Sequence, residues 1–355
     1  MVRFALLWIC LGLFVSCVKD KPNPVQTEKP NLNHSGVWVL NEGVYGNSNA
    51  DLSFIDLSDN TVYNNLYKQH YGESFGDIAQ DVQWIQQTLW VTVNNSNKII
   101  ILDPNTFQPI HEIKNIISPR YMQSIGDSVV LVTSLTTNHI YCIRTSTFEV
   151  FKVIDVNYPG TEHLVLHNNY VYVTNWHENS PLLYRIHVPD FNLASSIILK
   201  HKASHDVVVD ADDNIWVLSG NPYKNVSSHL QVLHAQTYQT VKDLAFPNAA
   251  EPIRLCCDME RKNLYFIGVN YSGQTTYNGL FKMNYLDDVL PQQPFIPANL
   301  NSYFYSVAIN PTNNFIFLAD ANGFNQRSTL YEFSGNGKLQ HTFITGLGST
   351  KMLFQ

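Results

Sequence analysis

Short apolar runs alternate with polar turns along the chain, and this pattern repeats from about residue 35 to the end. Each repeat has an apolar strand, a turn, a second strand centred on an aromatic residue or Leu, a polar loop and two further alternating strands. The runs are rich in Val, Ile, Tyr and Phe, and Gly, Asn, Asp and Pro separate them, which is typical of short β-strands and turns. Because we find no long stretch with helical periodicity, the pattern predicts an all-β protein.

The second strand of each repeat gives the period. Consecutive copies are 41 to 52 residues apart, measured between their second residues. Four strands with their loops over about 40–50 residues are the repeat of a propeller blade. Seven copies therefore predict a seven-bladed β-propeller. The copies are Val37–Leu40, Leu89–Val93, Val130–Thr133, Val171–Thr174, Ile215–Leu218, Leu264–Ile267 and Phe315–Leu318.

The two ends of the repeat region complement each other. The first repeat begins with its second strand at Val37, so it lacks an inner strand. The last repeat is followed by an extra apolar segment, Thr350–Phe354. A ring avoids an open sheet edge if this segment completes the first blade. We therefore expect one propeller domain over residues 36–355, closed by a C-terminal strand.

The N-terminus has the pattern of a targeting segment. Residues 1–16 contain Arg3 and an apolar run from Phe4 to Val15, which is too short to span a bilayer but fits a signal peptide. The run ends in Ser16-Cys17, which resembles a bacterial lipobox and implies cleavage before Cys17 and lipidation of its thiol. An ordinary secretory signal is the alternative. Residues 17–35 are polar and proline-rich, so we expect a flexible tether.

Composition limits the possible partners. Charged residues make up 14% of the 355 residues, against about 25% in an average soluble domain. The formal net charge is −7, and no basic block is present, so nucleic-acid binding is not expected. The polar surface must therefore come mainly from uncharged groups such as the frequent Asn side chains.

One face of the predicted ring carries the candidate binding residues. In a propeller the inner strand begins, and the second strand ends, on the same face, so residues there surround the mouth of the central channel. Amide and aromatic side chains gather at these positions, with few charges, which suits a large, mostly neutral ligand that carries amides. Single Asn residues could instead be turn residues, and the charges could form ion pairs between blades. The candidates are Asn41, Glu42, Tyr45, Asn94, Asn95, Arg120, Tyr121, Glu162, Asn175, Trp176, Tyr223, Tyr305, Asp320 and Asn322.

Signatures of catalysis are scarce. The chain has no G-x-S-x-G elbow, no H-E-x-x-H motif and no paired Cys-x-x-Cys. His201 and His205 are four residues apart, a spacing that separates side chains by about 13 Å on a strand. We therefore expect a protein that is not an enzyme and that needs neither a metal nor another cofactor. A propeller lyase or lactonase and a surface scaffold for proteins or glycans remain open.

Several motifs carry a resemblance to a known family. Leu40–Asp56, Gly76–Gln80, Val93–Ser96, Asp103–Phe107, Ser118–Tyr121, Asn175-Trp176 and Ala319–Ala321 occur in the order found in Bacteroidetes surface lipoproteins with YncE-like seven-bladed propellers. The chain resembles in particular the BtuG-type cobalamin-binding members of this group. The resemblance implies a lipid-anchored outer-membrane protein, exposed at the cell surface, that binds a corrinoid and passes it to a TonB-dependent transporter. A corrinoid has a flat macrocycle with neutral amides and one phosphate, which Asn, aromatic and Arg120 side chains could contact.

Overall fold

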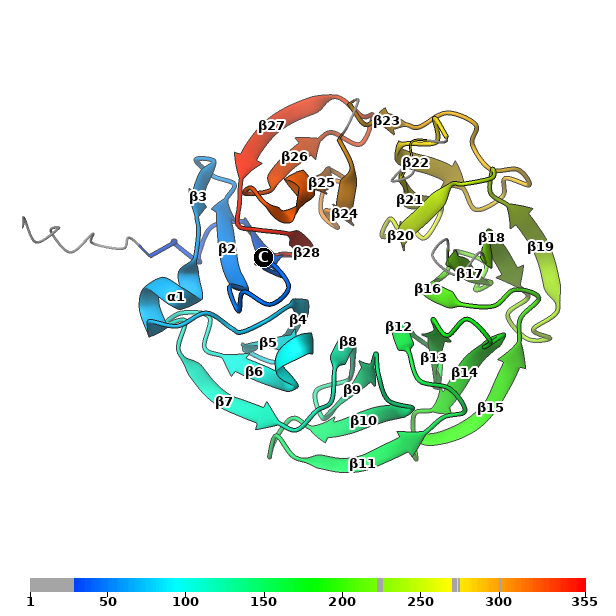
Figure 1. The fold of residues 1–355 in the computed structure, drawn as a ribbon, viewed down its shortest axis with the longest axis horizontal. Helices are drawn as coiled ribbons and strands as arrows, with labels where there is room; N and C mark the ends of the chain where they lie inside the picture. The colour runs from blue at the N-terminus through cyan, green and yellow to red at the C-terminus, as the bar shows by residue number, and fades with distance from the viewer. Residues whose placement is uncertain (1–28, 222–225, 270–272, 274, 300–301) are drawn as a thin grey trace, which may run out of the picture.

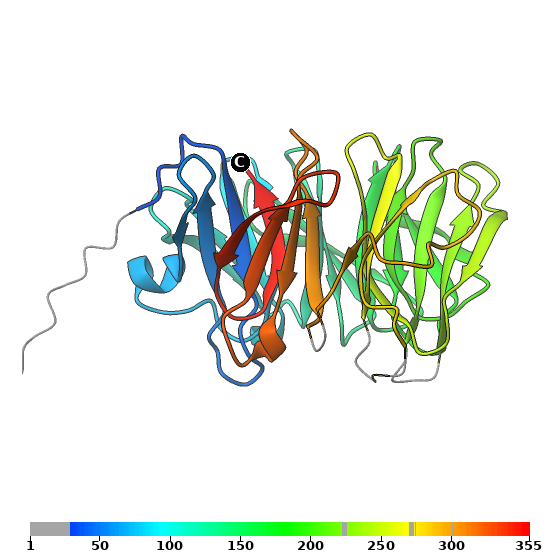
Figure 2. The same cartoon turned by 90° about the horizontal axis from the view of Figure 1, so that it is seen from above.

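The computed structural model describes residues 29–221, 226–269, 273, 275–299 and 302–355. In these residues, seven antiparallel sheets of four strands each are arranged in a ring (Figure 1). Seen from the side, the strands run between the two faces of the ring (Figure 2). The structure thus confirms the all-β, seven-bladed propeller that the repeat predicts.

Each blade is named here in chain order, with its inner strand first. Blade 1 contains β28 (Ser349–Phe354), β1 (Gly36–Asn41), β2 (Asp51–Asp56) and β3 (Thr61–Tyr63). Blade 2 contains β4 (Ala79–Ile85), β5 (Thr88–Val93), β6 (Lys98–Leu102) and β7 (Pro109–Lys114). Blade 3 contains β8 (Pro119–Ile125), β9 (Val129–Ser134), β10 (His139–Arg144) and β11 (Val150–Asp155). Blade 4 contains β12 (Thr161–His167), β13 (Tyr170–Asn175), β14 (Leu182–His187) and β15 (Asn192–Ile198).

The remaining three blades follow the same order. Blade 5 contains β16 (Ser204–Val209), β17 (Ile215–Asn221), β18 (Val226–Leu233) and β19 (Thr240–Ala245). Blade 6 contains β20 (Glu251–Cys257), β21 (Asn263–Val269), β22 (Gly279–Asn284) and β23 (Ile296–Pro297). Blade 7 contains β24 (Phe304–Ile309), β25 (Ile316–Asp320), β26 (Thr329–Phe333) and β27 (Leu339–Ile344). Short helical segments are α1 (Leu66–Tyr71), η1 (Asn94–Ser96) and η3 (Asn322–Phe324).

The C-terminal strand closes the ring as the sequence predicts. β28 pairs antiparallel with β1, from Val37 opposite Phe354 to Asn41 opposite Ser349. The Trp38 indole N–H also donates to Oε1 of Gln355 at 2.9 Å. Blade 1 is therefore built from both ends of the propeller region, which ties the first and last strands together.

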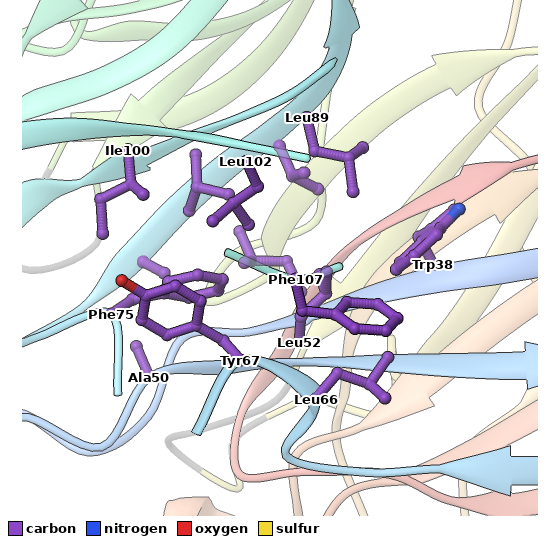
Figure 3. Packing of buried hydrophobic residues seen from close by; sticks show 14 of the residues in the cluster. Trp38, Ala50, Leu52, Leu66, Tyr67, Phe75, Leu89, Ile100, Leu102 and Phe107 are labelled. Carbon is purple, nitrogen blue, oxygen red and sulfur yellow. The ribbon is translucent and has the colours of Figure 1, made fainter. Parts of the chain in front are cut away.

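The core is divided among the seven interfaces between neighbouring blades. Side chains alternate between the two faces of each strand, so successive residues of a middle strand enter different interfaces. On β1, Val37 and Val39 pack toward blade 7, whereas Trp38 and Leu40 pack toward blade 2. Figure 3 shows the second of these clusters, in which the ring centres of Trp38 and Phe54 are 4.9 Å apart. Because both faces of each blade are covered, the second strand of each blade is mostly apolar.

The packed part of the chain begins before residue 36. His34, within the segment predicted as a tether, approaches Asp56 at 2.7 Å, and the Gln355 amide donates to the carbonyl of Leu32. The predicted signal peptide, residues 1–16, and the predicted lipidation site, Cys17, lie outside the described residues. No helix in the described part of the chain is long and apolar enough to cross a membrane.

Candidate functional site

A β-bulge interrupts the inner strand of every blade. In each one the pairing with the second strand slips by one residue, as between Ala79 and Asp81 on β4 or between Ser204 and Asp206 on β16. Such an extra residue leaves the regular alternation, so its side chain can point in a new direction while its neighbours stay in the core. We call the residues at these slips the bulge ring: Gln80, Arg120, Glu162, His205, Arg254, Tyr305 and Thr350.

The bulge ring surrounds a cavity in the channel. Six of its seven members line a cavity of about 270 Å³, and Trp176 from the loop after β13 lines it as well. The other lining residues are Tyr121, Asp206, Gly220, Ser228, Glu251, Pro252 and Ile253. The cavity therefore combines an aromatic surface with polar side chains from six blades, and we call it the channel pocket.

Two arginines organise the wall of the channel pocket. Arg120 contacts Glu162 through both Nε and Nη2, at 3.0 and 2.8 Å, and its Nη1 donates to Gln80. Arg254 donates from Nε to the carbonyl of Tyr305 at 3.1 Å. Its Nη1 donates to the Tyr121 hydroxyl at 2.8 Å, which links blade 6 to blade 3 across the channel.

Each guanidinium keeps spare donor capacity. A guanidinium has five N–H groups. Besides the two bonds given above, Nη2 of Arg254 donates to the Thr350 hydroxyl at 3.1 Å. Three N–H groups of Arg120 and three of Arg254 therefore bond to described residues. Two N–H groups on each arginine thus have no partner in the described part of the protein. Burial lowers the pKa of Arg120, but the Glu162 carboxylate and the Tyr121 hydroxyl together raise it by more, so the guanidinium stays charged.

The backbone at Arg254 is held in an uncommon conformation. Its φ is +61°, in the left-handed region, which costs a residue with a side chain about 1–2 kcal/mol. The Arg254 N–H donates to Oδ2 of Asp206 at 3.1 Å, and the three guanidinium bonds hold the side chain. These contacts offset the strain and fix the direction in which Arg254 enters the channel.

Acidic groups balance the arginines. Asp206 lies 2.9 Å from Nδ1 of His163 and 2.9 Å from Nδ1 of His205. Burial raises the pKa of Asp206, but these two histidines lower it by more, so its pKa is well below the usual value. Glu42 accepts a hydrogen bond from the Tyr305 hydroxyl at 2.9 Å, and burial raises its pKa despite the nearby Arg254. The pocket wall therefore has mixed charge: Asp206 lines it as a carboxylate, and Glu42, behind Tyr305, is more readily protonated than an ordinary Glu.

The structure brings some of the predicted site residues together at the channel. Arg120, Tyr121, Glu162, Trp176 and Tyr305 all line the channel pocket. Glu42 is buried behind Tyr305, within hydrogen-bond distance of its hydroxyl.

Three predicted amides are buried and bonded within the protein. The Asn41 side chain donates to Ser53 and accepts from Gly346 and Ser349. Asn94 donates to the carbonyl of Pro119 at 3.1 Å. Asn175, with no exposed surface, donates to the carbonyl of Pro159 at 2.9 Å. These amides satisfy backbone and side-chain groups at the ends of strands, which is the turn role that the sequence left open.

The other predicted residues lie outside the channel pocket. Asn95 donates to Asp77, and Asn322 donates to the carbonyl of Arg327 at 2.7 Å. Asp320 accepts from the backbone N–H of Asn322 at 2.8 Å. Tyr45 is 77% exposed and is not part of the pocket lining. Tyr223 lies outside the described residues.

Four lining residues that matter most were absent from the predicted set. Gln80, His205, Asp206 and Arg254 all belong to the first residues of inner strands. The start of the inner strand, which gave Arg120, Glu162 and Tyr305 as candidates, would have found them too if it had been applied to every blade. At least one polar residue, the one at the bulge, lies within the first few positions of every inner strand.

A second cavity lies on loops of blades 1 and 7. Its volume is about 460 Å³, and its lining is polar: Asn41, Asn47, Ser48, Asn49, Asp51, Asn65, Lys68, Ser74, Asn325, Gln326, Arg327, Gly346 and Leu347. This lining contains no aromatic residue among those that the structure describes. Because binding sites for organic ligands combine apolar surface with a few polar groups, the channel pocket is the better candidate.

Comparison with solved structures supports the fold. A quinonprotein alcohol dehydrogenase-like protein from Bacteroides thetaiotaomicron has a TM-score of 0.66 at 15% identity, covering 91% of this chain and 79% of that chain. Virginiamycin B lyase from Staphylococcus aureus has a TM-score of 0.57 at 14% identity, covering 76% of this chain and 85% of that chain. At such identities the likeness shows the fold alone.

Sequence comparison gives the family. No curated protein matches the chain. A family model described as a domain of unknown function, DUF5074, matches residues 35–343, nearly the whole propeller. The chain belongs to the DUF5074 family.

Proposed function

We propose that this protein is a ligand-binding protein of the bacterial outer-membrane surface, which binds a corrinoid in the channel pocket without converting it. The observation that carries the proposal is the pairing of two arginines that have spare N–H groups with the aromatic wall at Trp176. Charged donors of this kind bind a phosphate strongly, and an indole ring offers a flat apolar surface.

The size of the pocket determines how such a ligand would bind. A cavity of about 270 Å³ is slightly smaller than sites for drug-sized molecules, which start near about 300 Å³. A whole corrinoid is larger than that. We therefore infer that one polar part of the ligand, its phosphate or an amide side chain, enters the pocket while the flat macrocycle rests on the rim.

Delivery to a TonB-dependent transporter follows from the same proposal. The Ser16-Cys17 pattern supports a lipid anchor, and the tether after it would let the ring reach a membrane partner. The resemblance to BtuG-type proteins supports a corrinoid transporter as that partner.

Calorimetry with cobalamin and cobinamide, on the purified full-length protein, tests the ligand. Cobinamide lacks the nucleotide and its phosphate, so cobalamin should bind at least about 10-fold more tightly if an arginine meets the phosphate, since one charge-assisted hydrogen bond contributes about 1.5–3 kcal/mol. Mass spectrometry should recover the ligand unchanged. If neither ligand gives heat or a thermal shift, the corrinoid proposal is wrong.

A matched pair of aromatic variants tests the location. Trp176→Ala removes an aromatic wall of the pocket and should weaken binding, whereas Tyr45→Ala removes an exposed aromatic side chain outside it and should not. Equal effects of the two variants, or none from Trp176→Ala, would place the ligand elsewhere.

A further inference from the structure

Two histidines and an aspartate converge on the surface of blade 5, away from the channel. His229 lies on β18 and Asp243 on β19, and β19 is at the outer edge of the ring (Figure 1). His201 comes from the loop that connects β15 of blade 4 to β16 of blade 5. Nε2 of His201 is 2.8 Å and Nδ1 of His229 is 3.3 Å from the same oxygen, Oδ1 of Asp243.

The register of the blade 5 sheet explains why His229 of β18 and Asp243 of β19 lie on the same face of that sheet. His229 is opposite Ala245, and Gln231 is opposite Asp243. His229 and Asp243 are therefore diagonal neighbours on one face of the antiparallel pair, within reach of their side chains. This placement follows from the blade itself and does not depend on a flexible loop.

The loop that carries His201 is fixed by backbone bonds. The Lys200 N–H donates to Oε1 of the buried Gln231 at 3.0 Å. The Leu199 N–H donates to the carbonyl of Pro181 at 2.7 Å, and the Ala203 N–H donates to the carbonyl of Ser180 at 3.1 Å. Anchors on both sides of His201 hold its ring over that of His229.

The two imidazole rings are stacked, with centres 3.5 Å apart and planes 12° from parallel. A ring nitrogen of each histidine already faces the Asp243 carboxylate. Neutral imidazole is the form that binds a metal ion.

We propose that His201, His229 and Asp243 form a binding site for a transition-metal dication, and that Zn²⁺ is the ion it takes. Two ligands of one tetrahedral Zn²⁺, each about 2.1 Å from the ion, are about 3.4 Å apart. The two distances to Oδ1 of Asp243 are 2.8 and 3.3 Å, close to this separation, and one imidazole ring must rotate out of the stack so that a nitrogen lone pair of each ring points at the ion. All three ligand atoms lie within 4.8 Å of one another.

The site is open to solvent, and the ammonium group of Lys200 competes with a metal ion for the Asp243 carboxylate. The side chains of His201, His229 and Asp243 are 21%, 19% and 27% exposed, so an ion can enter from solvent. Nζ of Lys200 lies 3.4 Å from Oδ2 of Asp243 and adds a positive charge next to the site. Three protein ligands leave a fourth position for water. A bound ion would cross-link the connection between blades 4 and 5 to the outer strands of blade 5.

Zn²⁺ titration of the full-length protein, freed of metal with a chelator, tests the site by calorimetry at pH 7.5. We expect one Zn²⁺ per chain. His229→Gln and Asp243→Asn each remove a ligand and should weaken binding by at least about 100-fold. Lys200→Gln removes the competing charge and should tighten it. His139→Gln, which alters another His–Asp pair, with 2.7 Å between His139 and Asp155, is the matched control and should bind as the parent does.

Two further readouts separate binding from folding. Co²⁺ in place of Zn²⁺ should give the visible absorption of a tetrahedral site, and His229→Gln should lack it. Thermal melts without metal should be alike for the parent, Lys200→Gln and His139→Gln. The proposal is wrong if the parent binds no Zn²⁺ at micromolar concentrations, or if His229→Gln binds it as tightly as the parent.

Discussion

The ion pair between Arg120 and Glu162 should be strongly coupled, because both side chains are shielded from water. Their side chains are 15% and 3% exposed, and two nitrogen atoms of Arg120 contact the carboxylate. Removing one partner of a buried pair leaves the other charge uncompensated, which costs about 3–5 kcal/mol. We expect Glu162→Gln to lower the free energy of unfolding by about 3 kcal/mol. This value is at the lower end of that range because the Arg120 side chain is 15% exposed to the channel.

A double-mutant cycle measures the coupling. Charge-assisted hydrogen bonds contribute about 1.5–3 kcal/mol, so Arg120→Gln together with Glu162→Gln should cost about 2 kcal/mol less than the sum of the two single variants. Urea unfolding at pH 7 gives all four values. Glu112→Gln, at the more exposed pair with Lys98, is the control and should cost at most about 1 kcal/mol. Single effects that add to within about 0.5 kcal/mol would refute the coupling.

Two other predictions concern stability. Deleting residues 349–355 removes the inner strand of blade 1 and uncovers β1, so we expect calorimetry to show the loss of cooperative unfolding; a truncated chain that melts like the parent would contradict ring closure as the source of stability. Burial raises the pKa of Asp51 to about 6 from an ordinary 3.8, so the folded protein holds this proton more tightly than the unfolded chain does. Ionisation of Asp51 therefore costs stability as pH rises from about 4 to 6, and the free energy of unfolding of Asp51→Asn, relative to the parent, should increase by about 2 kcal/mol between pH 4 and pH 7. Urea unfolding at both pH values measures this change. If the difference in unfolding free energy between Asp51→Asn and the parent stays constant or decreases, the pKa of the Asp51 carboxyl group is not raised by folding.

The fold could be predicted because it depends on a signal that recurs. Seven apolar strands such as Val37–Leu40 are spaced at the length of a blade, and the extra segment Thr350–Phe354 matches the strand missing from blade 1. Each copy supports the others, so an irregular copy such as Phe315–Leu318, where β25 begins at Ile316, does not alter the count.

The site could be predicted only in part, because the same residue types serve two roles. Asn41 and Asn175 follow a second strand, as residues at a channel mouth should, yet their amides bond to nearby groups of the protein. A sequence does not distinguish an amide that faces a ligand from one that caps a strand. The sequence did not indicate the proposed metal site, because its three residues are far apart in the chain. The sheet register brings His229 and Asp243 together, and the anchored loop between blades 4 and 5 adds His201, 28 residues before His229.

The bulge explains how a symmetric backbone can carry an asymmetric pocket. In a regular strand, changing the side chain on one face also changes the packing of that face, because every position belongs to one interface or the other. The bulge adds one position per blade that belongs to neither interface. In this chain those positions hold Gln, Arg, Glu, His, Arg, Tyr and Thr, while the second strands next to them remain mostly apolar. Substitutions in the bulge ring can therefore alter what the channel binds at little cost to the core, except where, as at Arg120 and Glu162, the ring residues depend on each other.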